Sequence, residues 1–204
     1  MAGAGAVRGG SPAQWAEMDV NPHLAAWLER ALVIGCGLGD DAEKLARMGF
    51  AVVAFDVSPT AIAWCRARFP GSPVRYAVAD LFASPTDWQG AFDIVLEVYT
   101  RQVLPPDLQP PAIARIADYV APGGCLLVIC RGRDGGDDPG RMPWPLTREE
   151  LGLFRDHGVR EMRFEDYIEG NGSSTRRFRL EYRKVPVPDG SSPADTEQRA
   201  QDYR

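Results

Sequence analysis

The sequence predicts an α/β protein built around a mainly parallel sheet, and two patterns carry this prediction. Between residues 31 and 158, short apolar runs alternate five times with segments of helical period. Two further strand-like runs follow, on either side of Asn171 and Gly172, a pair that favours a hairpin turn. Strands that alternate with helices form parallel sheets with right-handed crossovers. The chain is therefore expected to hold five β-α units followed by an antiparallel pair.

The composition is that of an ordinary globular domain. The 204 residues suffice for one sizeable core, and the net charge of −5 provides no basic field to attract nucleic acid or an anionic membrane. No apolar run approaches about 18 residues, so no membrane span is expected. The four cysteines, Cys36, Cys65, Cys125 and Cys130, lack CxxC spacing and are interpreted as reduced, buried side chains. These features favour a cytoplasmic protein, and nothing in the sequence predicts a metal site.

The chain is expected to divide into one domain and two tails. Residues 1–11 are rich in Gly and Ala without a period, which indicates disorder. Residues 12–184 are predicted to form the domain, and its first part, up to Glu29, is predicted to be a helical cap. Residues 185–204 turn to Pro, Ser and Asp and are expected to be a disordered tail.

The first β-α-β unit is the most informative stretch. Ala31–Ile34 is a continuous apolar run, typical of a strand that is buried on both faces. A glycine turn follows at residues 35–39, and Asp40 then suits the start of a helix, where a carboxylate meets free N–H groups. Ala51–Phe55 is the next predicted strand, and it ends in Asp56.

The later units follow the same pattern with less distinctive ends. Ser58 and Pro59 predict an N-cap and a first helical residue. Thr147-Arg-Glu-Glu150 is a capping box that begins the last helix, which Gly158 ends. Between them, a long irregular segment at 131–146 has the length of a functional loop. The remaining strands are expected at Val74–Ala79, Phe92–Val98, Cys125–Cys130, Val159–Tyr167 and Thr175–Lys184, and Ala121–Gly124 is expected to stop the helix before the third of these.

Three features stand at the carboxyl ends of predicted strands, where ligands of parallel sheets bind. Gly35-x-Gly37-x-Gly39 allows a sharp turn and leaves no Cβ where a ligand must touch the backbone. Asp56, 21 residues after Gly35, suits two ribose hydroxyls, and Asp80 suits an exocyclic amine such as that of adenine. Each feature has a structural alternative, because glycines also serve tight turns and strand-end aspartates also cap helices.

The segments VIGCGLG, AFD at 54–56, VADL at 78–81, FDIVLEV and APGGCLLV resemble the class I S-adenosylmethionine-dependent methyltransferases over about half of the chain. The glycine loop and the closing hairpin look most similar to small-molecule enzymes of the tellurite and thiopurine type. The resemblance implies a Rossmann-like three-layer sandwich whose seven-stranded, mostly parallel sheet has an antiparallel last strand. It also implies methyl transfer from S-adenosyl-L-methionine to a small molecule by in-line displacement, with S-adenosyl-L-homocysteine as product.

The resemblance also implies how the cofactor is bound. The glycines face its methionine part, and Asp56 faces the ribose. Val57, Asp80 and Leu81 contact the adenine, and the segment Glu97–Tyr99 lies near the sulfonium. The implied cofactor-binding residues are Gly35, Cys36, Gly37, Gly39, Asp56, Val57, Asp80, Leu81, Glu97 and Val98. One position departs from the family, because Val33 stands where many members carry an acid that holds the cofactor's amino group. Asp40 or Glu97 is expected to replace it.

Candidates for the acceptor side lie beyond the strand ends and in the N-terminal helices. They are Trp15, His23, Tyr99, Arg101, Arg131 and Trp144. Tyr99 is the best candidate for a catalytic, substrate-positioning role, because it directly follows a strand. Arginines suit an anionic or carboxylate-bearing acceptor. Each candidate also has a plain structural interpretation, as a packed aromatic or as a solvated loop charge.

Two other functions remain open at this point. A non-catalytic module that binds S-adenosylmethionine would use the same residues. An NAD-dependent oxidoreductase is disfavoured, because its GxGxxG fingerprint differs from GxGxG and only His23 and His157 offer imidazole for acid–base chemistry. The expected partner is a small-molecule methyl acceptor, with no nucleic acid and no membrane, and the expected assembly is a monomer or a homodimer.

Overall fold

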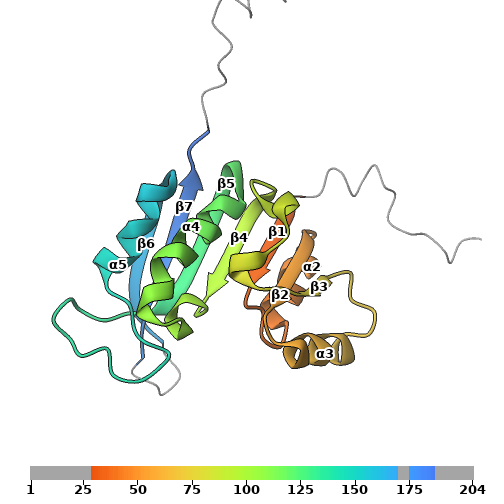
Figure 1. Ribbon diagram of the computed structural model, residues 1–204, viewed down its shortest axis with the longest axis horizontal. Coiled ribbons are helices and arrows are strands. Elements are labelled where there is room, and N and C mark those ends of the chain that lie inside the picture. The colour runs from red at the N-terminus through yellow and green to blue at the C-terminus, as the bar shows by residue number, and fades with distance from the viewer. Residues whose placement is uncertain (1–28, 170–174, 187–204) are drawn as a thin grey trace, which may run out of the picture.

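The computed structural model describes residues 29–169 and 175–186, which form a seven-stranded sheet in the order β3-β2-β1-β4-β5-β7-β6 (Figure 1). The strands are β1 (Arg30–Ile34), β2 (Ala51–Asp56), β3 (Arg75–Val78), β4 (Phe92–Val98), β5 (Val120–Arg131), β6 (Val159–Ile168) and β7 (Arg176–Lys184). Only β7 runs antiparallel to its neighbours β5 and β6, and the other described pairs are parallel. The predicted fold class, including the antiparallel last strand, is confirmed.

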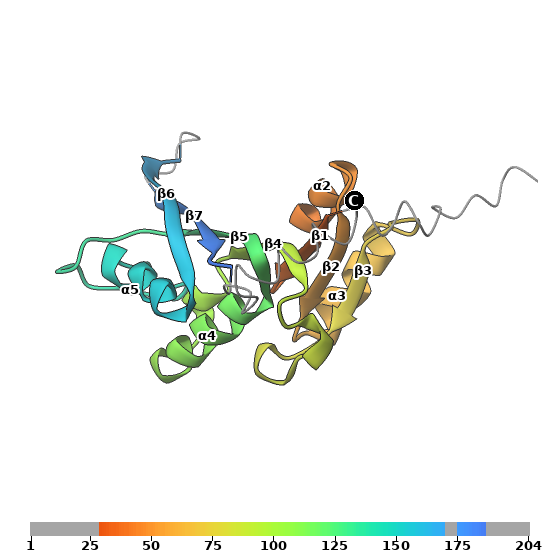
Figure 2. The same cartoon turned by 90° about the horizontal axis from the view of Figure 1, so that it is seen from above.

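Helices cover both faces of the sheet, so the fold has three layers. The α-helices are α2 (Asp40–Arg47), α3 (Pro59–Arg68), α4 (Gln109–Tyr119) and α5 (Arg148–Gly152). Short 3-10 turns, of which η2 (Leu81–Ala83), η4 (Arg101–Val103) and η6 (Leu153–His157) matter below, join them to the strands. Figure 2 shows α2 and α4 on opposite sides of the sheet.

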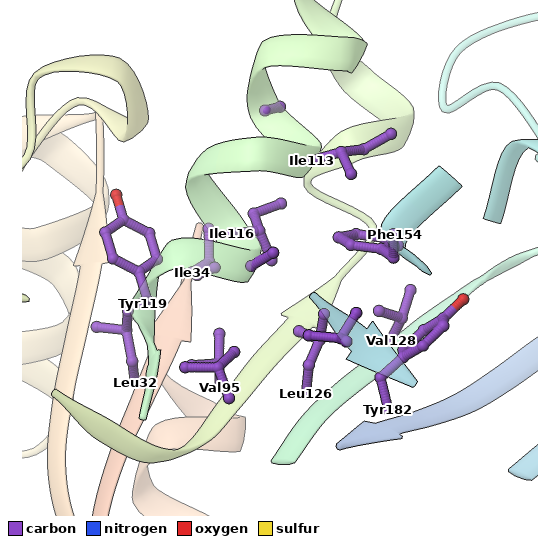
Figure 3. Close-up of a cluster of buried hydrophobic side chains, with 14 of the residues drawn as sticks. Leu32, Ile34, Val95, Ile113, Ile116, Tyr119, Leu126, Val128, Phe154 and Tyr182 are labelled. Atoms are coloured by element: carbon purple, nitrogen blue, oxygen red, sulfur yellow. The ribbon is translucent and has the colours of Figure 1, made fainter. Parts of the chain in front are cut away.

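Two hydrophobic clusters hold these layers together, one on each face. Leu32 and Ile34 of β1 belong to the larger cluster, with Ile113 and Ile116 of α4 (Figure 3). Ala31, Val33 and Ala54 belong to the second cluster, with Ala42 of α2 and Ile62 of α3. Because successive strand residues point to opposite faces, a strand buried on both sides must be apolar throughout. This explains the unbroken apolar run that the sequence shows at β1.

The predicted helix starts are confirmed at the atomic level. Ser58 Oγ accepts a hydrogen bond from the Ala61 N–H at 3.2 Å, and Pro59 is the first residue of α3. Thr147 and Glu150 form both hydrogen bonds of the predicted capping box. Gly158 ends the α5–η6 segment with a φ of 73°. These local signals were readable because a cap depends on residues within one turn of each other.

The start of β5 is a correction. The segment Ala121–Gly124 was expected as a loop that stops α4, but it lies inside β5, which begins at Val120. The pairing with β4 shifts here, since Phe92 pairs with Val120 and Ile94 pairs with Cys125. A Cβ on Gly124 would stand 3.0 Å from the carbonyl oxygens of Phe92 and Asp93. The glycines therefore allow a bulged strand that passes close to its neighbour, rather than a break.

Several expectations concern residues outside the described part of the chain. These are the disordered start, the helical cap with Trp15 and His23, the hairpin turn at 171–172, and the tail from residue 187 onward. Within residues 29–169 and 175–186, no helix is long and apolar enough to cross a membrane.

The core of the α4 face gives the first testable prediction. Ile116 is fully buried in the larger cluster, whereas Ile168 on β6 is 60% exposed. Ile116→Ala should lower the free energy of unfolding by about 2–5 kcal/mol in urea titrations, because it leaves a cavity in a packed layer. Ile168→Ala is the matched control and should change it by less than about 0.5 kcal/mol. Equal effects of the two substitutions would contradict the described packing.

Candidate functional site

A cavity of about 370 Å³ opens at the carboxyl ends of β1, β2, β3 and β4. The chain leaves β1 toward β2 and β3 on one side and returns to β4 on the other, so the strand order reverses here. Such a switch point is where open parallel sheets bind ligands. The lining residues are Ile34, Gly35, Phe55, Asp56, Val57, Ala79, Asp80, Leu81, Phe82, Val98, Tyr99, Thr100, Val103 and Leu104.

The glycine turn after β1 has a backbone that other residues would strain. Gly35, Gly37 and Gly39 all have positive φ, between 53° and 88°. A Cβ on Gly35 would collide with Thr100 Oγ1, and one on Gly39 would stand 2.6 Å from the Tyr76 hydroxyl. A Cβ on Gly37 would meet no described atom within 4 Å. Gly35 and Gly39 are thus required by neighbouring side chains, whereas Gly37 borders open space that suits a ligand.

Asp56 is fixed by two backbone donors from different segments. Its Oδ2 accepts from the Gly37 N–H at 3.0 Å, and its Oδ1 accepts from the Ser58 N–H at 2.9 Å. Both bonds are charge-assisted, and each carboxylate oxygen keeps a further lone pair. The side chain therefore both closes the turn and presents an oriented acceptor to the cavity.

Asp80 has a comparable double role at the end of β3. Its Oδ1 accepts from the Phe82 N–H at 2.9 Å, which caps the short helix η2. Asp80 is thus a helix cap, which is the structural alternative for this residue, and it also lines the cavity. Leu81 follows it and is 7% exposed, so it forms part of the cavity floor.

Tyr99 stands out in the backbone. It has a φ of 60°, the one positive value of a non-glycine residue in the described part of the chain. The neighbouring structure holds it there, because its N–H donates to Ile129 O at 3.2 Å and the Arg177 guanidinium lies 5.0 Å from the ring centroid. Burial raises the pKa of its phenol. Residues kept in this region of φ and ψ gather at functional sites.

Glu97, a predicted cofactor-binding residue, does not line the cavity. Side chains alternate along β4, so Glu97 points to the same face as Val95, toward α4, while Val98 faces the cavity. It is fully buried, and its Oε1 accepts from the Arg101 main-chain N–H at 3.0 Å. Burial raises the pKa of the carboxyl, and the contacts with Arg101 oppose that rise.

Asp40 does not supply the missing acid at the cavity either. Its carboxylate is 69% exposed and pairs with Arg68 through two hydrogen bonds of 2.9 and 3.0 Å. The Arg68 guanidinium holds the pKa of Asp40 below its ordinary range. Neither residue named as a replacement for the acid at Val33 therefore reaches the cavity, and Val33 itself is buried in the second cluster.

The structure brings part of the predicted site together. The predicted residues that line the cavity are Gly35, Asp56, Val57, Asp80, Leu81, Val98 and Tyr99. Cys36, Gly37 and Gly39 shape the turn behind it. The Cys36 side chain packs on the second cluster, and burial raises the pKa of its thiol to about 12.

The predicted acceptor residues Arg101, Arg131 and Trp144 do not line this cavity. Arg101 and Trp144 line a second cavity instead. The main chain of Arg131 is held by Gln102, which also follows β4 and does not line this cavity. Gln102 donates to the carbonyls of Arg131 and Trp144 and accepts from the Arg131 N–H at 2.8 Å, so it ties the 131–146 loop to the end of β4.

Sequence reasoning also missed the wall that follows Tyr99. Thr100, Val103 and Leu104 line the cavity, and Thr100 Oγ1 donates to Ile34 O at 3.0 Å. Thr100 packs closely against Gly35, which lies 65 residues earlier in the chain. No local sequence pattern predicts this contact. Among the described residues, no group of three or more His, Cys, Asp or Glu could hold a metal ion.

Comparison with known proteins finds similarity to methyltransferases over about half of the chain. Residues 31–124 match the model of a family described as a methyltransferase domain. A ubiquinone biosynthesis O-methyltransferase of Caulobacter sp. (strain K31) is 36% identical over 107 residues, which are 51% of this chain and 41% of that protein. A probable thiol methyltransferase 2 of Arabidopsis thaliana is 29% identical over 102 residues, 49% of this chain and 45% of that protein. The chain thus matches less than half the length of these relatives.

A solved structure agrees with the fold. The 1,6-didemethyltoxoflavin-N1-methyltransferase of Burkholderia thailandensis, crystallised with its substrate and S-adenosylhomocysteine, superposes with a TM-score of 0.63 at 21% identity. The match covers 84% of this chain and 81% of that one. This likeness shows the fold, and together with the match over residues 31–124 it supports a class I S-adenosylmethionine-dependent methyltransferase.

The fit between Gly35 and Thr100 is testable by a double-mutant cycle. Gly35→Ala should destabilise the protein by about 2–4 kcal/mol through overpacking and positive φ. Thr100→Ala should cost about 1 kcal/mol by removing one hydrogen bond. In the double variant the clash is relieved, so the loss in urea titrations should fall short of the sum by about 1 kcal/mol or more. Strict additivity would show that the two side-chain positions do not meet.

Proposed function

We propose that this protein transfers the methyl group of S-adenosylmethionine to a small-molecule acceptor. The observation that carries the proposal is the cavity at the switch point, with the Asp56 carboxylate fixed at its wall by two backbone N–H groups. The volume of about 370 Å³ lies at the lower end of the range of small-ligand sites. The described residues therefore fit a nucleoside-type cofactor, and we expect the acceptor to approach it from the open side of the cavity.

The proposed cofactor pose follows the residues along the strand ends. The methionine part lies against the glycine turn, where Gly37 leaves open space. The ribose hydroxyls donate to Asp56, Val57 lies beside the adenine, and Asp80 accepts from the adenine amine. Because Asp40 and Glu97 both lie away from the cavity, we expect main-chain carbonyls at the strand ends to hold the methionine amine.

The protein's contribution to the reaction is then mainly alignment. The sulfonium supplies an activated methyl group, and holding two reactants in line contributes roughly 7–11 kcal/mol in favourable cases. Tyr99 is the proposed positioning residue for the acceptor, because its strained backbone and its contact with Arg177 fix the ring at the cavity. Burial keeps its phenol protonated at neutral pH, so it donates a hydrogen bond rather than removing a proton.

The acceptor is proposed to be a small molecule methylated on sulfur, oxygen or nitrogen. The names of the relatives support this breadth, since they include an O-methyltransferase, a thiol methyltransferase and an N1-methyltransferase. The likeness to tellurite and thiopurine enzymes stays a prediction within that range. A thiolate needs no base, whereas an oxygen or nitrogen acceptor is helped by proton removal.

Cofactor binding can be tested without knowing the acceptor. Asp56→Ala should weaken S-adenosylhomocysteine binding in calorimetry by about tenfold or more, because it removes charge-assisted hydrogen bonds to the ribose. Asp93→Ala is the matched control. Asp93 accepts from the Arg30 N–H at the opposite end of the strands, so its loss should leave the affinity within about twofold. Unchanged binding by a folded Asp56→Ala protein would refute the proposed ribose position.

Turnover distinguishes the enzyme from a binding module. The protein should be incubated with S-adenosylmethionine and a panel of small thiols, phenols and amines, and the release of S-adenosylhomocysteine followed. We expect release with at least one class of acceptor. Tight cofactor binding without release across the whole panel would favour a non-catalytic module that binds S-adenosylmethionine.

A further inference from the structure

A second cavity lies on the other side of the segment that follows Tyr99. It measures about 300 Å³ and is enclosed by the start of α4, the 131–146 loop and the α5–η6 segment. Its wall is largely apolar, with prolines from both the α4 approach and the loop, and with Trp144, Ile113 and Leu153. None of the roles proposed above for the cofactor uses this space.

One charged side chain in this wall is buried without a partner. Arg101 is 1% exposed, and its Nε and Nη1 have no hydrogen-bond partner among the described residues. No ion pair of the described part of the chain includes it. Its guanidinium lies 5.7 Å from the centroid of the Phe154 ring, and Glu97 and Glu150 act on it only through longer-range electrostatics. Buried guanidinium donors are costly to leave unpaired, and because the Arg101 side chain lines the cavity, its unpaired guanidinium points to an absent acceptor there.

The neighbouring carboxylate does not fill this role. Glu97 gives its Oε1 to the main-chain N–H of Arg101, and its Oε2 is buried without a partner. Glu97 is absent from the cavity wall, and the distance to the guanidinium exceeds that of an ion pair. Burial also raises the pKa of Glu97, which weakens it as a counter-charge.

The second arginine in the wall is already engaged. Arg133 donates from Nε to Pro145 O at 3.0 Å, and its Nη2 faces both carboxylate oxygens of Glu150 at 3.3 and 3.4 Å. The cavity therefore has one arginine without an ion pair among the described residues, and the Glu150 carboxylate disfavours a second negative charge on a ligand. A singly charged acceptor with two oxygens matches the fork of the guanidinium.

We propose that this cavity binds a small monocarboxylate with an apolar body. The carboxylate accepts from the guanidinium of Arg101, and the apolar body packs on Trp144 and Ile113. Thr100 and Val103, on either side of Arg101, line the cofactor cavity, so one short turn of chain separates the two spaces. The carboxylate is carried either by the methyl acceptor, which rests on the proposed function, or by an effector, which does not.

The probe is benzoate, titrated into the wild-type protein and followed by calorimetry or by ligand-observed NMR. Benzoate should bind more tightly than about 10 mM, and the neutral isostere benzamide should bind about tenfold or more weakly. Arg101→Met keeps the length of the side chain and should lower benzoate affinity by the same factor. Arg160→Met, which removes an exposed arginine of β6, is the matched control and should leave it unchanged.

The stability of the same variants separates a binding role from a structural one. Arg101→Met should unfold at the same or a higher urea concentration than the wild type, because it removes a buried charge that lacks a partner. If this variant fails to fold, the affinities of the wild type for benzoate and benzamide still show whether the cavity prefers a carboxylate. Equal affinity for both probes, no binding of benzoate, or tighter binding of inorganic phosphate than of benzoate would each overturn the proposal.

Two experiments with cofactor present show whether the carboxylate belongs to the methyl acceptor or to an effector. Methylation of a carboxylate compound from an acceptor panel, lost in Arg101→Met, identifies the methyl acceptor. A shift in S-adenosylhomocysteine affinity caused by benzoate, again lost in Arg101→Met, identifies an effector. Both support the site. If the protein fails to bind S-adenosylhomocysteine, the proposed function falls while benzoate binding to Arg101 stands or falls separately.

Discussion

The carboxylate of Asp56 is the constraint on which the site depends. It joins the glycine turn after β1, the end of β2 and the start of α3, because its two oxygens accept from Gly37 and Ser58. Charge-assisted bonds to backbone N–H groups are among the stronger interactions available to a side chain. The positive φ at Gly37 turns its N–H toward that carboxylate. The same side chain that closes the turn thus also presents an acceptor to a ligand.

A second constraint is the segment that leaves β4. Tyr99 turns the chain with a strained backbone, Thr100 docks on Ile34, and Gln102 binds the two ends of the 131–146 loop through its amide. Residues of this segment face two cavities in turn, so it forms the wall between them. Because this wall borders both cavities, we expect a molecule in one cavity to alter binding in the other.

Much of the fold was predictable because its signals are local. Apolar runs, helical spacing and caps depend on residues a few positions apart, and they located the strands, the helices and the acids at the strand ends. The start of β5 was mispredicted, because the bulge opposite Phe92 depends on the close approach of two strands. The local sequence Ala121–Gly124 alone does not show this approach. The orientation of Glu97 was not predictable for a related reason, since only the register of β4 decides which face of the sheet its side chain points to.

The sequence by itself determined the fold class and the positions of the GxGxG turn and of the acids after β2 and β3, because each of these follows a local apolar run that marks a strand. The tertiary structure decided which side chains share a space. In the sequence, Arg101 looks like an ordinary exposed loop charge. In the structure it is buried and lies beside α4, η6 and the 131–146 loop. Contacts of this kind join segments far apart in sequence, and their energies depend on burial, which no local pattern records.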